Sequence, residues 1–215
     1  MGRIDNIITI LKRENKRYLE PIVTTVSRTR SPFKVLISCI LSLRTKDKVT
    51  AEASNRLFKL ADNPKKMLSI STRDIEKTIY PVGFYKTKSK RIKEICKILL
   101  GNYGGTVPDE IDELLKLKGV GRKTANLVVT LGYGKLGICV DTHVHRISNR
   151  LGLIKTKTPE RTEFSLRKKL PKKYWIIYND LLVAHGQNIC TPISPKCSKC
   201  KIFKYCKRVG VKNFR

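Results

Sequence analysis

The sequence predicts an all-α protein, and two patterns support this fold class. Apolar residues recur at the spacing of amphipathic helices almost throughout the 215 residues. No segment shows the alternation of apolar and polar residues that is typical of a half-buried strand. Helix starts are also marked, because N-cap side chains stand directly before first-turn prolines at Ser31-Pro32 and Thr158-Pro159.

The first predicted helices differ in how much of their surface is apolar. Ile4, Ile7 and Leu11 form one stripe, which predicts an amphipathic helix near the N-terminus. Residues 21–30 are interpreted as a connector. Residues 33–43 are apolar nearly all round, so we expect this helix to be the buried, central one.

The remaining predicted helices follow the same spacing. The run at 86–103 is strongly basic outside its apolar stripe, and such a run is usually a solvated face. The stripe of Trp175, Tyr178, Leu182 and His185 is interpreted as core. The other predicted helices cover residues 46–60, a short segment opened by Asn63-Pro64, 72–79, the segment that Pro108 starts, 141–151, 159–170 and 174–187.

The charge of the chain is strongly positive and limits the classes of partner. Lys and Arg number 46 against 17 Asp and Glu, which gives a net charge of +29 and an isoelectric point near 10.1. This excess implies a polyanionic partner, either nucleic acid or an anionic membrane surface. No apolar run approaches the ~20 residues of a membrane span, and the N-terminus lacks the apolar core of a signal peptide. We expect a soluble, intracellular monomer, located in the cytoplasm or nucleoid if the source is prokaryotic.

A helix–turn–helix pattern surrounds the segment GVGRK. Gly119 and Gly121 flank Val120, and two glycines around one apolar residue allow a tight turn that approaches another surface closely. The second helix then starts with N–H groups that lack intrahelical partners and with the positive end of its dipole exposed. This arrangement binds phosphate, and Lys118 and Arg122 lie beside it. The alternative is that the turn is only a connector.

Lys123 lies in the first turn of that second helix. The positive end of the dipole disfavours an ammonium group, so we expect the pKa of Lys123 to lie below its ordinary value of about 10.4. A neutral amine can attack a carbonyl or hemiacetal carbon and form a Schiff base. The alternative is an ordinary solvated lysine on a helix.

Asp141 stands where another helix is predicted to start. Its carboxylate is a good N-cap, and it can also exchange a proton or stabilise a developing cation. His143 and His145 are two residues apart and face different ways on a helix. A phosphate contact or polar packing is therefore a better interpretation of these histidines than a metal pair.

Four of the seven cysteines cluster near the C-terminus. Cys190, Cys197, Cys200 and Cys206 form the pattern C-x6-C-x2-C-x5-C, and four thiolates this close in sequence imply a metal. Zinc usually takes two close pairs, whereas one close pair flanked by single cysteines suits a cubane [4Fe–4S] cluster better. Zinc and unpaired thiols remain the alternatives. The other cysteines lie in apolar surroundings and are expected to be buried, unreactive thiols: Cys39, Cys96 and Cys139.

Two segments together resemble a known family. LKGVGRKTANLVV followed by VDTHVHRISNRLGL is similar to the helix-hairpin-helix and catalytic segment of endonuclease III, a bifunctional DNA glycosylase and abasic-site lyase. The spacing of the four C-terminal cysteines also matches the iron–sulfur loop of that family. The resemblance implies that Lys123 is the nucleophile, that Asp141 is its partner, and that the four cysteines hold one [4Fe–4S] cluster per chain.

The resemblance also implies an architecture of two helical domains flanking a DNA-binding groove. Residues 21–133 would form the domain that contains the helix-hairpin-helix motif. Residues 1–20 and 134–215 would form the second domain, which contains the C-terminal [4Fe–4S] loop. Lys123 and Asp141 would then come from the two sides of the groove.

The resemblance assigns further DNA contacts outside the hairpin. Arg44 occupies a position where the family usually has a glutamine that fills the space left by the everted base, so the lesion preference stays open; the alternative is a basic loop residue that touches nothing. Phe84 matches the residue that the family wedges into the duplex, with core packing as the alternative for Phe84 and Tyr85. Lys196 belongs to a lysine-rich, acid-free loop between the cysteines, which a structural cluster would present to DNA. His143 is expected to contact phosphate.

The implied function is base-excision repair of double-stranded DNA that carries a damaged base or an abasic site. The damaged nucleotide flips out, and Lys123 displaces the base by attacking C1′ with the help of Asp141. The resulting Schiff base undergoes β-elimination, which cleaves the strand 3′ to the lesion, without a divalent metal. The substrates would be oxidised or ring-saturated pyrimidines. The alternatives are a mismatch-specific glycosylase of the same superfamily, which often lacks the lysine, and a non-catalytic, metal-stabilised DNA-binding module.

Overall fold

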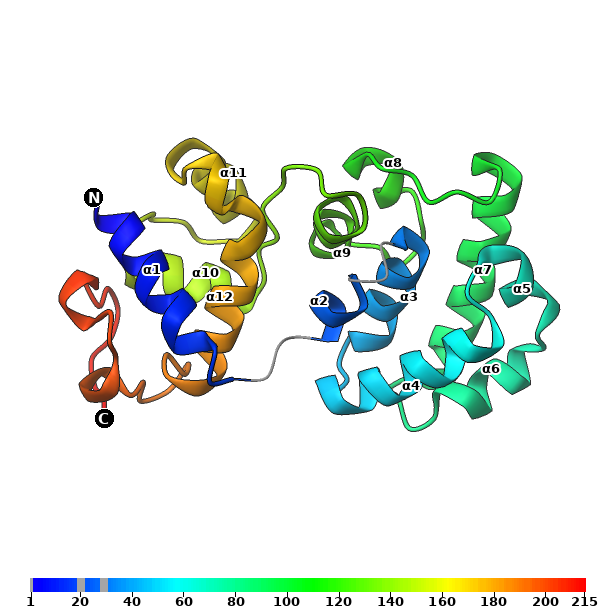
Figure 1. Cartoon of the computed structure of the whole chain (residues 1–215), viewed down its shortest axis with the longest axis horizontal. Helices are drawn as coiled ribbons and strands as arrows, with labels where there is room; N and C mark the ends of the chain where they lie inside the picture. Colours follow the sequence, from blue (N-terminus) through cyan, green and yellow to red (C-terminus); the bar gives the residue numbers. More distant parts are fainter. Residues whose placement is uncertain (1, 19–21, 28–30) are drawn as a thin grey trace. The chain divides into compact units, whose positions relative to one another are not determined.

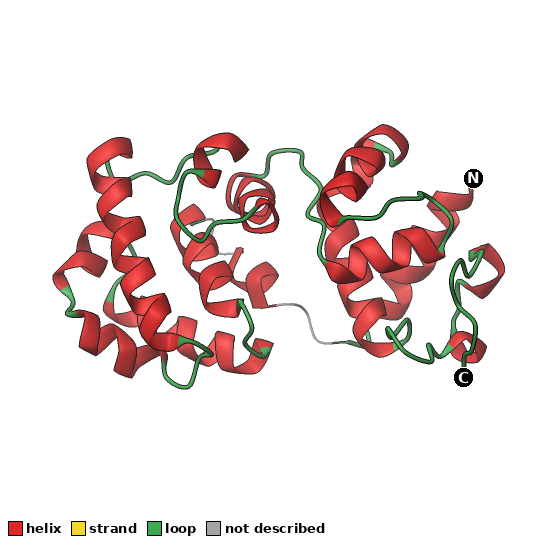
Figure 2. Cartoon of the chain, turned by 180° about the vertical axis from the view of Figure 1, so that it is seen from behind, coloured by secondary structure: helices red, strands yellow, loops and turns green. Residues whose placement is uncertain are grey.

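Helices make up the regular structure of the chain in the computed structural model (Figure 1, Figure 2). The structure describes residues 2–18, 22–27 and 31–215, and no strand occurs within these ranges. The predicted all-α class is therefore confirmed. Within the same ranges, no helix is both long and apolar enough to cross a bilayer.

The chain divides into two compact units. Ile22–Lys135 forms the central unit, and Met1–Pro21 together with Leu136–Arg215 forms the terminal unit. The terminal unit therefore combines both ends of the chain. The domain boundaries predicted from the sequence fall between residues 20 and 21 and between residues 133 and 134.

The central unit consists of helices that run from blue to green in Figure 1. Its last helix continues directly into a π-helical segment, η1. The elements are α2 (Ile22–Ser27), α3 (Pro32–Ser42), α4 (Asp47–Leu60), α5 (Pro64–Ser69), α6 (Thr72–Ile79), α7 (Tyr85–Tyr103), α8 (Ile111–Leu115), α9 (Arg122–Leu127) and η1 (Val128–Gly132).

Helix α3 is the buried centre of the central unit. Leu36 and Ile37 have no exposed surface, and α2, α4, α7, α9 and η1 all pack against the helix. Gly132 of η1 comes so close that a Cβ there would lie 3.0 Å from Cα of Pro32. The prediction of a buried central helix at residues 33–43 is confirmed except at its end, because α3 stops at Ser42 and Leu43 is 41% exposed.

The predicted connector at residues 21–30 is wrong in part. Ile22–Ser27 forms helix α2, whereas residues 21 and 28–30 lie outside the described part of the chain. The helix is rich in β-branched residues, which have a low intrinsic helix propensity. Val23 and Val26 are buried, and α2 packs against α3 and α4. Tertiary packing therefore overrides the local preference.

The helix expected to start at Pro108 is shorter than predicted. Helix α8 spans only Ile111–Leu115. Lys135 Nζ forms ion pairs with Asp109 at 2.9 Å and with Glu110 at 2.6 Å. These two acids are therefore bonded to the segment that follows η1, and the residues between Pro108 and α8 stay outside the helix.

The terminal unit is built around α12. Helices α1 and α10 pack against α12, and α11 packs against α10. The predicted core stripe of Trp175, Tyr178, Leu182 and His185 is buried, which confirms that interpretation. The elements are α1 (Arg3–Asn15), α10 (Thr142–Arg150), α11 (Pro159–Lys169), η2 (Lys172–Tyr174), α12 (Trp175–Asn188), η3 (Cys197–Lys199) and η4 (Phe203–Tyr205).

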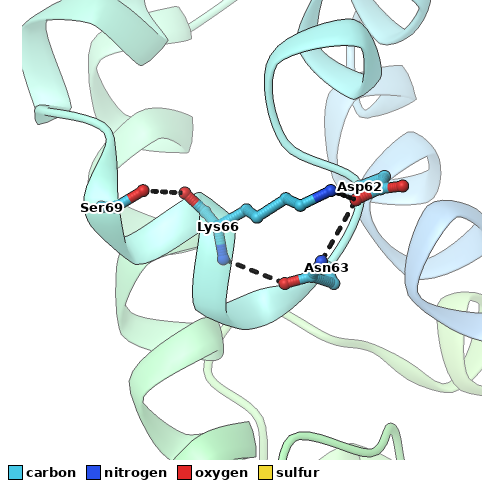
Figure 3. A network of polar contacts seen from close by, with 4 residues as sticks. All are labelled: Asp62, Asn63, Lys66 and Ser69. Carbon is cyan, nitrogen blue, oxygen red and sulfur yellow. Dashed lines mark hydrogen bonds and ion pairs between the residues drawn. The ribbon is translucent and has the colours of Figure 1, made fainter.

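Polar side chains begin several helices at the predicted places. Ser31 and Thr158 each accept a hydrogen bond from a backbone N–H in the first turn of α3 and α11. Figure 3 shows the start of α5, where Oδ1 of Asn63 accepts from the backbone N–H of Lys66 at 2.9 Å and Lys66 Nζ pairs with Asp62 at 3.1 Å. Each cap satisfies a donor that the helix itself leaves without a partner.

Basic side chains donate hydrogen bonds to the carbonyl groups at the ends of several helices. Lys93 Nζ donates to the Leu68 carbonyl oxygen at the end of α5 (2.5 Å), and Arg56 Nε donates to the Thr78 carbonyl oxygen of α6 (2.8 Å). Lys88 is only 6% exposed and donates to carbonyl groups at the end of α3. The expectation of a solvated basic face on α7 is therefore wrong for Lys88, because the last carbonyl groups of a helix need external donors.

Substitution of the central core should be costly. Leu36→Ala removes buried side-chain volume from α3 and is expected to lower the free energy of unfolding by about 2–5 kcal/mol. Leu60→Ala is the matched control, because Leu60 is 55% exposed and its loss should change stability by about 0.5 kcal/mol or less. Urea unfolding of the two variants measures both values. Equal losses would contradict the burial of α3.

Asp5 makes the stability of the terminal unit depend on pH. Its carboxylate accepts a hydrogen bond from the Tyr174 hydroxyl and pairs with Lys173 at 3.0 Å, which lowers the pKa of Asp5 to about 2. A lowered carboxyl pKa contributes stability that is complete above the unfolded-state pKa of about 3.9 and is lost as the pH falls through the folded-state pKa. Asp5→Asn should therefore destabilise the protein at pH 6, and the difference from the wild type should shrink as the pH falls below the unfolded-state pKa and vanish only below the folded-state pKa of about 2. Urea unfolding at a series of pH values tests this, and a pH-independent difference would be the contrary result.

Candidate active site

The hairpin turn joins α8 to α9 within the central unit. Gly119 has a φ of +84°, a left-handed conformation that favours glycine, and a Cβ there would lie 2.5 Å from Nη1 of Arg91. Val120 is buried, and its N–H donates to the Leu117 carbonyl oxygen at 2.9 Å. Gly119 and Gly121 are exposed. The turn therefore anchors Val120 inward and presents the backbone of both glycines at the surface.

The start of α9 has the features of an anion site. Gly121 is the N-cap residue and has no side chain that could cap the helix. The first N–H groups of a helix lack intrahelical partners, and the helix dipole adds positive potential at this end. Lys118 is exposed and Arg122 is partly exposed beside the turn. The backbone and the flanking charges together suit a phosphate group.

Lys123 is the second residue of α9, and its side chain is exposed. The three residues that follow it, Thr124, Ala125 and Asn126, are buried, and α9 packs against α3. The helix is tied to η1 by Thr130, whose hydroxyl donates to the Asn126 carbonyl oxygen at 2.7 Å. The amine of Lys123 is therefore carried by a packed element at the surface, where it can act as a nucleophile.

Asp141 belongs to the terminal unit and caps α10. Its Oδ1 accepts a hydrogen bond from the backbone N–H of Val144 at 2.8 Å, which confirms the predicted N-cap, and the residue is partly exposed. Nδ1 of His143 lies 3.1 Å from Nη2 of Arg146. Nδ1 of His145 instead lies 2.7 Å from the hydroxyl oxygen of Thr162 in α11. The two histidines have different neighbours, as their spacing predicts.

Two arginines that the sequence analysis overlooked connect α10 to the cysteine-rich segment. Arg146 donates to the carbonyl oxygens of Cys190 at 2.8 Å and Gly186 at 3.3 Å. Arg150 donates to the Thr191 carbonyl oxygen at 2.7 Å and to Sγ of Cys190 at 3.4 Å. Their spacing of four residues puts both on one face of α10, and this spacing is the feature by which they could have been recognised.

The four C-terminal cysteines surround one pocket in the terminal unit. Apolar side chains form much of the wall of this pocket. Nη1 of Arg150 donates to Sγ of Cys190, and the backbone N–H of Arg208 donates to Sγ of Cys206, both at 3.4 Å. All four cysteines line the pocket: Cys190, Cys197, Cys200 and Cys206.

Burial controls the protonation of these thiols. It raises the pKa of Cys200 to about 11 and also raises the pKa of Cys197 and Cys206. A metal that binds thiolates must therefore displace protons. Among the described residues, no three His, Cys, Asp or Glu side chains converge closely enough to hold a single metal ion.

The three remaining cysteines are buried, as predicted. Burial raises the pKa of Cys39 and of Cys96 to about 12, which keeps both as unreactive thiols near neutral pH.

Arg44 and Phe84 lie together in the central unit. Both side chains are exposed, and the guanidinium carbon of Arg44 lies 5.7 Å from the centroid of the Phe84 ring, within the range of a cation–π contact. The alternatives of an Arg44 that touches nothing and of core packing for Phe84 are therefore both wrong. Tyr85 is partly buried and packs edge-on against Tyr80 at a centroid distance of 5.4 Å.

Lys196 is partly buried at the edge of the cysteine pocket. The other lysines of the same segment are more exposed: Lys199, Lys201 and Lys204. The central unit thus contains the hairpin, Lys123 and the Arg44–Phe84 pair, and the terminal unit contains Asp141 and the cysteines.

Sequence comparisons identify relatives over most of the chain. Residues 37–172 match the model of a family described as HhH-GPD superfamily base excision DNA repair protein. Endonuclease III of Thermotoga maritima is 49% identical over 175 residues, which cover 81% of this chain and 82% of that protein.

Solved structures of relatives share the fold. A structure described as a trapped endonuclease III–DNA covalent intermediate is 36% identical, with a TM-score of 0.76 over 83% of this chain and 84% of that one. A thermostable thymine-DNA glycosylase is 27% identical, with a TM-score of 0.82 over 96% of this chain and 95% of that one. The chain therefore belongs to the HhH-GPD superfamily of base excision DNA repair proteins and, within it, to the endonuclease III family.

Proposed function

We propose that Lys123 is the catalytic nucleophile of this chain, a base-excision DNA glycosylase and abasic-site lyase. The observation that carries the assignment is the position of Lys123, exposed in the first turn of α9 directly after the hairpin turn. A hairpin that binds a phosphate brings this amine to the adjacent sugar. A relative that is 36% identical has been solved as a covalent intermediate with DNA, which is consistent with a nucleophile supplied by the protein.

The reaction proceeds in two stages. The neutral amine of Lys123 attacks C1′ of the damaged nucleotide, and the base leaves with the electron pair of the glycosidic bond and takes up a proton. Opening of the sugar ring then gives a Schiff base, which acidifies the protons on C2′. Loss of one of these protons and departure of the 3′-phosphate cleave the strand 3′ to the lesion, and water releases the amine.

Asp141 is assigned to proton transfer and to stabilising the positive charge that develops on the sugar. Its hydrogen bond from the backbone N–H of Val144 orients the carboxylate. A carboxylate that is fixed before the substrate arrives needs no reorganisation during the reaction.

The proposed substrate is double-stranded DNA with an oxidised or ring-saturated pyrimidine, or with an abasic site. The net charge of +29 favours capture of this polyanion; if the source is prokaryotic, the compartment is the cytoplasm or nucleoid. The hairpin residues 118–122 are assigned to phosphate. His143 and Lys196 are assigned to further backbone contacts, and Arg44 and Phe84 to the space left by the flipped nucleotide.

We assign one [4Fe–4S] cluster to the four cysteines of the terminal unit. All four cysteines line one pocket, and one close pair flanked by single cysteines suits a cubane cluster better than zinc, which usually takes two close pairs. N–H donors at the sulfur atoms of Cys190 and Cys206 are also expected around such a cluster. The bound cluster would supply a covalent link among four points of a segment that has little core of its own. Arg146 and Arg150 connect that segment to α10.

A mismatch-specific glycosylase is the second candidate, because a thymine-DNA glycosylase shares the fold with a TM-score of 0.82. An enzyme of that kind would release thymine from a mismatch and leave the strand intact. Duplexes that carry either thymine glycol or a G·T mismatch distinguish the two activities by base release and strand cleavage.

Borohydride trapping tests the nucleophile. The native protein is expected to form a covalent adduct with abasic-site DNA, and Lys123→Ala to form none, with strand cleavage lower by about 10³-fold or more. Lys116→Ala is the matched control, since it removes an exposed lysine shortly before the hairpin that is assigned no DNA contact, and it should keep the adduct. An adduct that persists in Lys123→Ala would contradict the assignment.

Metal analysis tests the cluster. Protein purified without oxygen is expected to be brown, with about four iron atoms and four sulfides per chain. Cys200→Ser should lose the iron and the visible absorption, whereas Cys96→Ser, which changes a buried cysteine of the central unit, should retain both. A colourless protein with stoichiometric zinc would overturn the assignment.

A further inference from the structure

A buried ammonium group lies between the loops that carry Arg44 and Phe84. Lys88 is 6% exposed, and its Nζ donates to the carbonyl oxygens of Leu41 (2.8 Å) and Leu43 (2.5 Å) and to Oγ1 of Thr45 (3.1 Å). These acceptors match the three donors of an ammonium group. The two carbonyl groups lie at the C-terminal end of α3, where the helix dipole favours a cation. Burial lowers the pKa of Lys88 to about 8.

The two loops are also linked directly. Oγ1 of Thr45 accepts a second hydrogen bond, from the backbone N–H of Gly83 at 3.1 Å. A Cβ at Gly83 would lie 2.6 Å from the carbonyl oxygen of Arg44, so the two backbones are in contact. The segment before α4 and the segment before α7 are therefore held in one fixed relation.

Arg44 and Phe84 share an unusual backbone conformation. Their φ angles are +53° and +58°, in the left-handed region that non-glycine residues rarely adopt. Such a conformation persists only where the surrounding structure imposes it. The contacts of Lys88, Thr45 and Gly83 lie directly beside both residues, and the exposed guanidinium carbon of Arg44 lies 5.7 Å from the centroid of the exposed Phe84 ring.

We propose that Lys88 is a positioning residue that holds Arg44 and Phe84 as one unit during base flipping. This inference rests on the DNA contacts assigned to Arg44 and Phe84 in the proposed function. Two side chains on independent loops would enter the duplex separately, and the base stack would close again behind the first. A linked pair opens the stack and fills the vacated space in one step. Lys88 acts from within the protein, because its ammonium group is buried and its donors are used.

The test compares Lys88→Met with Lys93→Met. Both changes remove an ammonium group of α7 that donates to carbonyl groups at a helix end. Lys93 bonds to Leu68 and Ile70 at the end of α5, so it is a control for the general loss of such a contact.

Three readouts separate positioning from stability. The first is the fluorescence change of 2-aminopurine placed opposite a tetrahydrofuran abasic analogue when the protein binds the duplex. The second is the rate of base release from duplex DNA that contains thymine glycol. The third is borohydride trapping on a single-stranded abasic oligonucleotide, which has no opposite strand and no stack to open.

Lys88→Met is expected to lose most of the fluorescence change and to lower base release about tenfold or more, while trapping on single-stranded DNA stays within about twofold. Lys93→Met should leave all three readouts within about twofold of the wild type. Equal behaviour of the two variants would overturn the proposal.

If Lys88→Met does not fold, Thr45→Val removes the acceptor shared by Lys88 and Gly83 and should shift the same two duplex readouts in the same direction. Unchanged duplex readouts in Thr45→Val would then overturn it.

A double-substitution series tests the unit itself. Arg44→Ala and Phe84→Ala are compared alone and together for base release from the duplex. If the two side chains act as one unit, the double variant is expected to lose about as much activity as either single variant. Losses that multiply would show independent side chains and would overturn the proposal.

Failure of the proposed function has a different signature. The wild type would then form no adduct with single-stranded abasic DNA and release no base. Failure of the present inference leaves both activities in place and removes only the difference between Lys88→Met and its control.

Discussion

The fold depends on basic side chains that donate to carbonyl groups at helix ends. Each α-helix leaves its last carbonyl groups without intrahelical partners, and a unit built from short helices has many such ends in its interior. Lys88 and Lys93 donate to carbonyl oxygens at the ends of α3 and α5. Arg56 and Arg146 donate in the same way near the ends of α6 and α12. In every case the donor comes from a different helix of the same unit, so the hydrogen bond also fixes the distance between two helices. Part of the positive charge is thus used in contacts between helices, and in the case of Lys88 this contact is buried.

This constraint explains why helix starts are easier to predict than helix ends. The N-caps Ser31, Asn63 and Thr158 bond to an N–H three residues ahead, so the whole interaction is contained in a short stretch of sequence. Lys88 bonds to a carbonyl group 47 residues away. Its neighbours on α7 give no indication of that partner, and the lysine therefore resembles the solvated residues around it. Helix α2 is missed for a related reason, since packing against α3 and α4 stabilises a sequence of low helix propensity.

The residues of the candidate site likewise differ in whether the local sequence indicates them. Lys123, Asp141 and the four cysteines stand in local motifs whose spacing indicates their chemistry, and the sequence is sufficient to propose them. The contact between Arg44 and Phe84 joins residues that are distant in sequence, and neither is a glycine that would indicate a positive φ. Arg146 and Arg150 are recognisable as one face of α10, but the carbonyl groups that they meet follow a different helix.

The contacts of Arg146 and Arg150 give the cysteine segment a physical connection to catalysis. In the proposed reaction, base release and β-elimination include no redox step, so the proposed cluster would contribute through structure. Arg146 and Arg150 lie in the C-terminal half of α10, and Asp141 caps the other end of that nine-residue helix. Both arginines donate to Cys190, and the proposed cluster would fix this residue and, through α10, support the orientation of the Asp141 carboxylate. Release of the segment would remove the hydrogen bonds that Arg146 and Arg150 make at the end of α10, the helix that Asp141 caps.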